Sequence, residues 1–377
     1  MNEEILNAAT ERFPNLTEAE QRMLRAERSE FANCGSDNDD SNPANNPEYG
    51  ESWGIERTIH ADVIWWLCRN AETFGRTASS GIAVSGAKIV DDLDLSYEDV
   101  RLPLVFMRCY FKNEIWLKNA KVLSLNLTGC RTHRILADGL HAASHVWFGN
   151  GFHAKGEVLF RDANIGGSFN VVGAIFEYDP TDDRSNSFNS LGCDRIKVNG
   201  SMFLRGSSFK GEVGLAGAFI GSNLDCDGGT FENLFDAQDG NRFAIRADRI
   251  TVGGSVFLRH QFSSKGSIRL LNAKIGTLDC TRATIEGDGK NGFNAEAATI
   301  SGHAVFDNFA IQNGGIEFRG VTADDASFRG AKLTTVDLRY ATTHLRIEPY
   351  RFSRGLSFRA AMPASATAIK SLTDSFI

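Results

Sequence analysis

Four aspartates occupy the middle of apolar–Asp–apolar triplets, namely Asp94, Asp225, Asp279 and Asp337. In a short strand the middle residue points away from its two neighbours, so these carboxylates are expected on the outer surface. Two carboxylates beside a shared groove can act as acid and base on a polysaccharide. Asp225 and Asp279 are therefore candidate catalytic residues, although an outward Asp in a repeat is also the ordinary solvated position.

Histidines form a second group, because His133, His141, His145 and His153 fall within one short stretch of the chain. Imidazole is a common ligand of Zn²⁺, which makes His141, His145 and His153 candidate metal ligands. The alternative is that a turning chain disperses them over different sides. We favour the second interpretation and predict no metal site.

A cofactor site is not expected. A dinucleotide fingerprint requires G-x-G-x-x-G between a strand and a helix. The nearest approach is Gly149, Gly151 and Gly156, whose final spacing is too long.

The seven cysteines include no C-x-x-C pair, which favours a reducing cytoplasm over a disulfide framework. Cys109 and Cys130 are spaced so that they would stack on neighbouring turns of a repeat, and Cys226 and Cys280 occupy equivalent apolar positions. All four are predicted to be buried thiols that act as small hydrophobic residues.

A repeat must position these residues. The interval from Gly156 to Gly211 is equal to the interval from Gly211 to Gly266. Within this long period apolar residues recur in steps of five or six, as in Leu204, Phe209, Leu215, Ile220, Cys226 and Phe231. Such a step fits a chain that makes a strand of two or three residues, turns a corner and begins the next strand.

Four such sides make a coil of about 20 to 22 residues, and parallel coils stack about 4.8 Å apart. Residues 79–345, less three loops, then give about 11 coils and a length of about 50 Å. The predicted fold is mainly β: a parallel β-helix with a small N-terminal helical segment.

The segment Ala326–Tyr340 (ASFRGAKLTTVDLRY) resembles the pentapeptide-repeat proteins, with Ala326 and Phe328 as one pair of inward residues. The segment Gly81–Leu104 is similar to the start of a bacterial group of β-helix proteins often labelled membrane-associated oxidoreductase. The resemblance covers about 60–345 and implies a right-handed parallel β-helix with quadrilateral coils and a degenerate pentapeptide-like repeat.

The predicted organisation has five parts. The first, 1–33, is a helical arm in which Thr17 and Glu20 form a capping box. Ile59, Val63 and Trp66 give a helical apolar stripe in the third part. The five parts are the arm (1–33), a flexible acidic linker (34–55), a capping helix (56–78), the β-helix (79–345) and a C-terminal cap or tail (346–377).

The formal net charge of -7 is unevenly placed. Residues 1–75 hold 15 Asp and Glu against six Arg, whereas 76–377 hold 32 acidic and 34 basic residues. Some pentapeptide-repeat proteins imitate DNA and inhibit type II topoisomerases, but that role predicts acidic coils. Nucleic acid is therefore not the expected partner.

No apolar run is long enough to span a membrane, and the first residues lack the features of a secretory signal. A cytoplasmic location is expected.

The favoured function is a non-enzymatic scaffold that binds a protein partner. Binding would use the acidic arm or three loops, 178–187, 233–242 and 286–292, which follow or begin at Glu177, Glu232 and Glu286 and should emerge along one edge. The alternatives are a hydrolase or lyase acting on polysaccharide at Asp225 and Asp279, and a topoisomerase-directed DNA mimic. An uncovered β-helix end would allow a homodimer.

Overall fold

The computed structural model describes residues 2–26, 30–36, 42–70, 72–75, 81–182, 184, 188–235, 242–346 and 357–359. The chain is mainly β and forms a parallel β-solenoid of about 11 turns with a small N-terminal helical segment, which confirms the predicted fold class. The chain divides into two compact units. Unit 1 comprises Met1–Gly192 and Ile196–Asn199, and unit 2 comprises Cys193–Arg195 and Gly200–Ile377.

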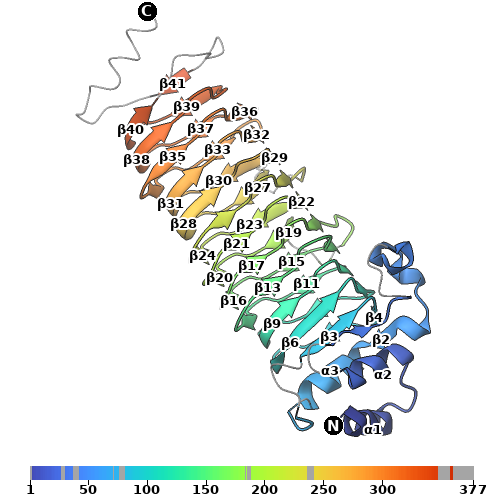
Figure 1. The fold of residues 1–377 in the computed structure, drawn as a ribbon. Coiled ribbons are helices and arrows are strands. Elements are labelled where there is room, and N and C mark those ends of the chain that lie inside the picture. The colour runs from blue at the N-terminus through green and yellow to red at the C-terminus, as the bar shows by residue number, and fades with distance from the viewer. Residues whose placement is uncertain are drawn as a thin grey trace, which may run out of the picture. The chain divides into compact units, whose positions relative to one another are not determined.

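Unit 1 contains three parallel sheets, which we call A, B and C (Figure 1). Sheet A holds β1 (Ala32–Asn33), β3 (Ile82–Ser85), β6 (Asp99–Met107), β9 (Lys121–Asn126), β12 (His141–Ala142), β13 (Val146–Trp147), β16 (Asn164–Ile165), β17 (Phe169–Asn170) and β20 (Lys197–Val198). Sheet B holds β2 (Thr58–His60), β4 (Lys88–Val90), β7 (Tyr110–Phe111), β10 (Arg131–Thr132), β14 (His153–Lys155) and β18 (Ile175–Glu177). Sheet C holds β5 (Leu93–Asp94), β8 (Ile115–Trp116), β11 (Ile135–Leu136), β15 (Val158–Leu159) and β19 (Asn189–Gly192).

Unit 2 repeats the same three-sheet plan. Its sheet A holds β21 (Met202–Phe203), β24 (Phe219–Ile220), β25 (Leu224–Asp225), β28 (Thr251–Phe257), β31 (Lys274–Asp279), β34 (Thr299–Ile300), β35 (His303–Val305), β38 (Thr322–Ser327) and β40 (Thr342–Arg346). Its sheet B holds β22 (Ser208–Lys210), β26 (Thr230–Glu232), β29 (Ser263–Lys265), β32 (Thr284–Glu286) and β36 (Ala310–Gln312). Its sheet C holds β23 (Glu212–Gly214), β27 (Phe243–Arg246), β30 (Ser267–Arg269), β33 (Phe293–Asn294), β37 (Ile316–Glu317), β39 (Thr335–Asp337) and β41 (Ser357–Arg359).

A coil of unit 1 consists of four short strands, as β12, β13, β14 and β15 show, and the first two of them share sheet A. Ala142 pairs in register with Ile165, and Ala154 pairs with Phe176. Each partner occupies the same place on the next coil, so the sequence separation of the partners is the coil length, which is close to the predicted one. The apolar residues of the five- and six-residue steps point inward and are buried. The periodicity therefore predicted both the short strands and the inward face.

Phenylalanine rings fill the interior of each unit. In unit 1 the rings of Phe160 and Phe169 meet edge to face with centroids 5.1 Å apart. In unit 2 Phe231 lies between Phe209 and Phe262, with centroid distances of 4.6 and 5.1 Å. All five side chains are fully buried. Such aromatic contacts add to the hydrophobic stabilisation of a core.

The N-terminal helices are α1 (Asn2–Arg12), α2 (Glu18–Arg25) and α3 (Ala61–Asn70). The predicted capping box is present, because the Glu20 N–H donates to the Thr17 hydroxyl at 3.1 Å and the Thr17 N–H donates to the Glu20 carboxylate at 2.7 Å. Among the described residues no helix is long and apolar enough to cross a membrane, and α1 has 11 residues.

The helix expected within 56–78 is shorter than the sequence indicated. Residues Ile55–Arg57 form the 3-10 helix η3, and Thr58–His60 form β2, which pairs in parallel with β4. Helix α3 begins only at Ala61 and buries Val63, Ile64 and Leu67 as it packs on β2, β5 and β6. It therefore covers the first coil of unit 1, next to β2 (Figure 1).

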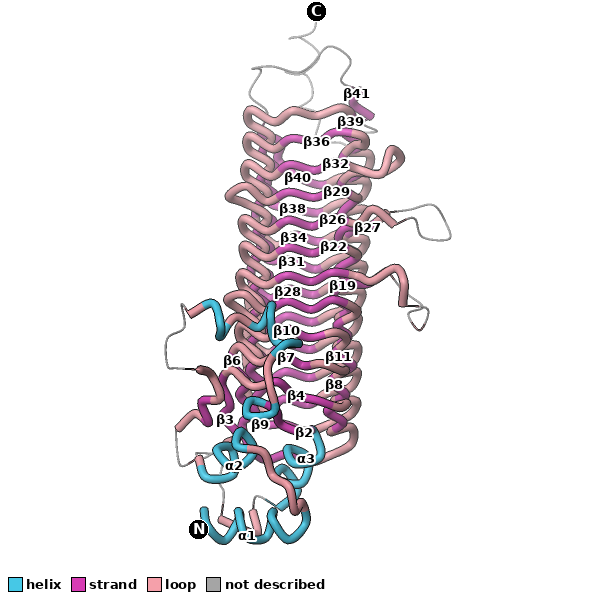
Figure 2. Tube along the Cα trace, turned by 90° about the vertical axis from the view of Figure 1, so that its right-hand side faces the viewer, coloured by secondary structure: helices cyan, strands magenta, loops and turns pink. Residues whose placement is uncertain are grey.

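The segment expected to be a flexible linker contains regular structure. Two 3-10 helices, η1 (Pro43–Asn45) and η2 (Pro47–Ser52), follow one another, and η2 packs on β7 and β10 (Figure 2). Asn42 and Asn46 cap these two turns with their side-chain oxygens. Of the predicted C-terminal cap or tail, only Arg346 and β41 belong to the described residues.

Candidate functional site

The corner between sheets B and C of unit 1 carries a column of charged residues. Asp92, Glu114, Arg134 and Glu157 each stand directly before the first residue of a sheet C strand, on four successive coils. Because parallel coils stack about 4.8 Å apart, equivalent side chains on neighbouring coils lie within interaction distance. Backbone hydrogen bonds hold the corners together, with Ile135 N–H donating to the Glu157 carbonyl at 3.0 Å.

Arg134 is the centre of a buried ion-pair network. Its guanidinium nitrogens lie 3.6 Å from the Glu114 carboxylate, 3.3 Å from that of Glu157 and 3.6 Å from that of Asp182. The side chains of Arg134, Glu114 and Glu157 are only 10%, 9% and 5% exposed. Removing charges from water is costly unless each has partners. The network therefore fixes all of these side chains in one arrangement.

The loop that follows β18 contributes Asp182 and Arg184 to this network. Arg184 pairs with the Glu114 carboxylate at 2.6 Å and with Asp182 at 2.8 Å. The hydrogen bond from Arg184 lowers the pKa of Asp182. The hydroxyl and backbone N–H of Thr181 donate to Asp179 at 2.6 and 2.9 Å and lower its pKa. The described part of the loop is thus held on the corner by its own charges.

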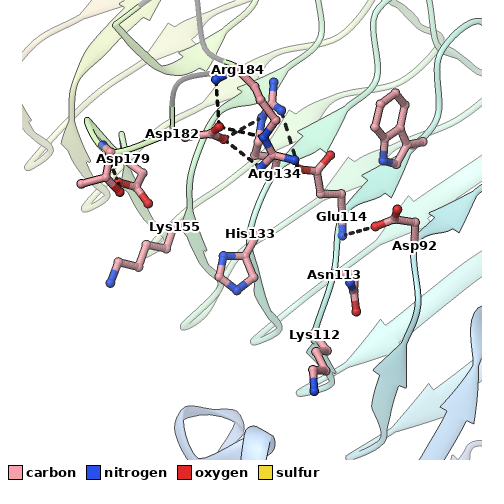
Figure 3. A pocket seen from close by; sticks show the side chains of 12 residues that line it. Asp92, Lys112, Asn113, Glu114, His133, Arg134, Lys155, Asp179, Asp182 and Arg184 are labelled. Carbon is pink, nitrogen blue, oxygen red and sulfur yellow. Dashed lines mark hydrogen bonds and ion pairs between the residues drawn. The ribbon is translucent and has the colours of Figure 1, made fainter.

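A groove of about 570 Å³ lies between the corner column and this loop (Figure 3). The turn between β14 and β15, at this corner, requires Gly156, which has φ +135. A Cβ at this position has no room, because it would lie 2.9 Å from Arg134 Cγ. The lining consists of Asp92, Lys112, Asn113, Glu114, Trp116, His133, Arg134, Lys155, Asp179, Thr181, Asp182 and Arg184.

His133 and Lys155 extend from the network into the open part of the groove (Figure 3). Within the described residues neither side chain makes a hydrogen bond or an ion pair, although Lys155 is near enough to Asp179 to contribute to its low pKa. The carboxylates of Glu114 and Asp182, which form the floor of the groove, are in contrast already paired with arginines. The groove can therefore bind a polar group through His133 and Lys155 without disturbing its own floor.

The structure separates the two candidate catalytic aspartates by one coil of unit 2. Asp225 pairs in register with Phe257, and Phe257 pairs with Asp279, so the two lie about 10 Å apart along the stack. Arg205 lies 3.3 Å from the Asp225 carboxylate, and Arg259 lies 3.4 Å from that of Asp279. Burial raises the pKa of Asp225.

The Arg259 guanidinium also stacks over the Phe257 ring, 4.0 Å from its centroid. The hydroxyl of Thr281 donates to Asp279 at 2.6 Å. These contacts tie both aspartates into a ladder of arginine and carboxylate side chains.

The candidate metal ligands lie on different sides of the coil. His141 is on sheet A, whereas His153 is on sheet B and lies 3.1 Å from Glu177. His145 stacks on Trp147 with ring centroids 5.2 Å apart, and its Nδ1 accepts the Ser168 N–H at 2.9 Å. Among the described residues no group of three or more His, Cys, Asp or Glu side chains is arranged to hold a metal ion.

Glu177, Glu232 and Glu286 end β18, β26 and β32, which all belong to sheet B. Each of the three loops therefore occupies the corner between sheets B and C of its own coil. Residues 183, 185–187 and 236–241 of these loops lie outside the described residues. In unit 1 this is the corner that forms the groove.

Sequence reasoning missed the residues that build the groove, namely Glu114, Arg134, Glu157, Asp182 and Arg184. A signal was present for three of them. Glu114, Arg134 and Glu157 each precede an apolar residue that begins a strand, and each follows the previous one at a spacing close to one coil. The other side of the same corner, where the strands of sheet B end, holds His133, Lys155 and Glu177.

No protein-family model matches the chain, and no curated protein matches it. The parallel β-solenoid is shown by the structure itself. The resemblance to pentapeptide-repeat proteins and to the oxidoreductase-labelled group rests on the sequence patterns alone.

Proposed function

We propose that this chain is a non-enzymatic binding protein whose groove at the corner of sheets B and C in unit 1 holds a protein partner. The observation that carries this proposal is the pairing of the buried Glu114 carboxylate with Arg134 and with Arg184, which holds the loop over the corner. A groove that is already formed costs less conformational entropy on binding. His133 and Lys155 then supply donors to the partner.

The pairing pattern favours binding over catalysis. A general acid or base needs a carboxyl group that is free to exchange its proton with a substrate. Glu114 and Asp182 are each ion-paired with both Arg134 and Arg184. Such carboxylates are already engaged by arginines and serve to position the loop.

The test is affinity capture of the tagged full-length chain from its native cells, quantified by mass spectrometry. A His133→Glu/Lys155→Glu variant replaces the two donors in the open part of the groove with carboxylates and does not touch the buried network. Its matched control is Lys197→Glu/Lys274→Glu, which changes two outward lysines of sheet A.

We expect at least one protein to be enriched with the wild type and the control but lost with the groove variant. An unchanged set of captured proteins in the groove variant contradicts the proposal. Enrichment of no protein above a tag-only sample contradicts it as well.

A further inference from the structure

Residues 42–53, which we call the strap, lie on the outer face of sheet B in unit 1 through charged contacts. The Glu48 carboxylate forms an ion pair with Arg131 of β10. The Glu51 carboxylate accepts the Tyr110 hydroxyl at 2.8 Å and lies 3.2 Å from Lys112 Nζ. Lys88 Nζ donates to the backbone carbonyl of Glu51. Both carboxylates of the strap are therefore met by cations or donors of this face.

The backbone of the strap fits the face closely at Gly50. A Cβ at this position would lie 2.2 Å from the Cβ of Tyr110, a distance that real Cβ atoms do not reach. Pro47 and Gly50 are buried, whereas the two residues between them, Glu48 and Tyr49, are exposed. The face thus receives a narrow stretch of backbone and holds the acidic side chains around it.

The strap is anchored at its ends rather than along its charged middle. The Trp53 indole N–H donates to the Ala44 carbonyl at 3.1 Å, and the Arg57 guanidinium stacks 3.6 Å from the Trp53 ring centroid. Arg57 also donates to the Gly86 carbonyl at 2.9 Å. These contacts fix both ends of the strap independently of Glu48 and Glu51.

The contacts of the charged middle are individually weak. The side chains of Glu48 and Glu51 are 54% and 60% exposed, and ion pairs at such positions contribute about 0 to 1 kcal/mol each. A second acidic segment could therefore replace the middle of the strap while its ends stay attached.

We propose that the outer face of β4, β7 and β10 is a docking surface for an acidic peptide segment of a partner protein, and that the strap occupies it as an internal ligand. The recognised feature is a pair of carboxylates placed as Glu48 and Glu51 are. Arg131 takes the first carboxylate, and Tyr110 with Lys112 takes the second.

The charges around the face favour an acidic peptide over a nucleic acid. Its cations are Lys88, Lys112 and Arg131, and the Glu177 carboxylate of β18 acts on Arg131. A phosphodiester chain gains affinity by neutralising many phosphates, for which this face has few cations. Two separated carboxylates on a peptide match the few donors available.

This inference goes beyond the proposed function, because the strap-covered face lies beside the groove, shares Lys112 with it and binds a different segment. His133 and Lys155 test the groove, and Arg131 and Gly50 test the face. Either set of variants can fail while the other succeeds.

The probe is a fluorescein-labelled synthetic peptide with the sequence of residues 42–54, NPANNPEYGESWG. Its binding to the full chain is followed by fluorescence polarisation. The Gly50→Val variant displaces the internal strap, because its side chain collides with Tyr110, and leaves the face itself intact. We expect this variant to bind the peptide at least tenfold more tightly than the wild type does.

Three controls define the recognition. Adding Arg131→Glu to Gly50→Val should weaken binding at least tenfold, whereas adding Lys274→Glu on sheet A should leave it within twofold. A peptide with both glutamates replaced by glutamine should bind at least tenfold more weakly. Equal binding to wild type and Gly50→Val, or equal binding of the glutamine peptide, overturns the proposal. Tighter binding of an oligothymidylate than of the peptide also overturns it.

A second measurement covers the case in which Gly50→Val does not fold, as judged by circular dichroism. An excess of unlabelled peptide is added to the wild-type chain, and amide hydrogen exchange is measured. Exchange should become faster at residues 46–52, where the strap is displaced, while β7 and β10 keep their protection. Unchanged exchange at residues 46–52 contradicts the proposal.

Discussion

The Tyr110 hydroxyl donates a hydrogen bond of 2.8 Å to the Glu51 carboxylate, which joins the acidic N-terminal segment to β7. Burial raises the pKa of Tyr110 to about 12, and the bond to Glu51 adds to the effect. In return, the hydrogen bonds from Tyr110 and Lys112 lower the pKa of Glu51. The acidic segment therefore has a defined attachment to sheet B.

Replacing Tyr110 with phenylalanine should loosen the strap and leave the solenoid folded. The substitution removes one hydrogen bond to a charged acceptor but keeps the ring that packs on Gly50. We expect the free energy of local opening of the strap to fall by about 1 kcal/mol. Amide hydrogen exchange at residues 46–52 measures this change. Tyr97→Phe, at a residue that is 70% exposed, is the control and should show wild-type exchange.

Acidification should release the middle of the strap. The pKa of Glu51 is lowered in the folded chain, so its contribution is present at neutral pH and is lost as the pH falls through that depressed value. Protonation removes the ion pair with Lys112. Because Trp53 and Arg57 hold the ends of the strap independently of Glu51, the change is confined to its middle, and amide hydrogen exchange at residues 46–52 should report it between pH 7 and pH 3. A Glu51→Gln variant should lose the part of the transition due to Glu51, and an identical titration would contradict this assignment.

The sequence allowed the solenoid to be predicted, because a step of five is visible in any single coil. The sequence-based prediction was wrong at Ile59, because the spacing of Ile59 to Val63 fits a helix. Ile59 instead lies in β2 and is fully buried against β4. Its strand partner, Ile89, comes only after the whole of α3 and β3, so local periodicity could not reveal the pairing.

The groove was harder to predict than the coils. Its network joins Glu114, Arg134 and Arg184, which are brought together only by stacking of coils and by the fold of one loop. The prediction that loops occupy one corner was sufficient to indicate the region. It could not identify which charges meet, because the coil from Glu114 to Arg134 is shorter than the coil from Arg134 to Glu157.

Removing the central cation of the network should destabilise unit 1 strongly. Arg134→Met would leave Glu114, Glu157 and Asp182 close together without their shared partner. Breaking a buried ion pair in this way costs about 3 to 5 kcal/mol. Urea unfolding followed by circular dichroism measures the loss. Arg161→Met is the matched control, because the side chains of the Arg161–Asp138 pair are 42% and 28% exposed and the pair should contribute about 1 kcal/mol or less.

The cysteines should be unreactive in the folded chain. All seven are free and buried, and burial raises the pKa of Cys34 and of Cys68 to about 12. The thiolate is the reactive form, so a high pKa and burial both suppress attack on a disulfide reagent. Titration with Ellman's reagent should release almost no thiol from the native chain and all seven in denaturant. A rapidly reacting thiol in the native chain would contradict the buried positions.

Truncating the central ring of the stack in unit 2 should open a cavity. Phe231 is fully buried between Phe209 and Phe262, so Phe231→Ala removes both ring contacts and leaves a space that neighbouring coils cannot close. The expected cost is about 3 to 5 kcal/mol in the free energy of unfolding. Urea unfolding provides the measurement, with Phe219→Ala as the control, because Phe219 is 42% exposed and its loss should cost about 0.5 kcal/mol or less. Equal effects of the two substitutions would mean that Phe231 does not bear the packing of this stack.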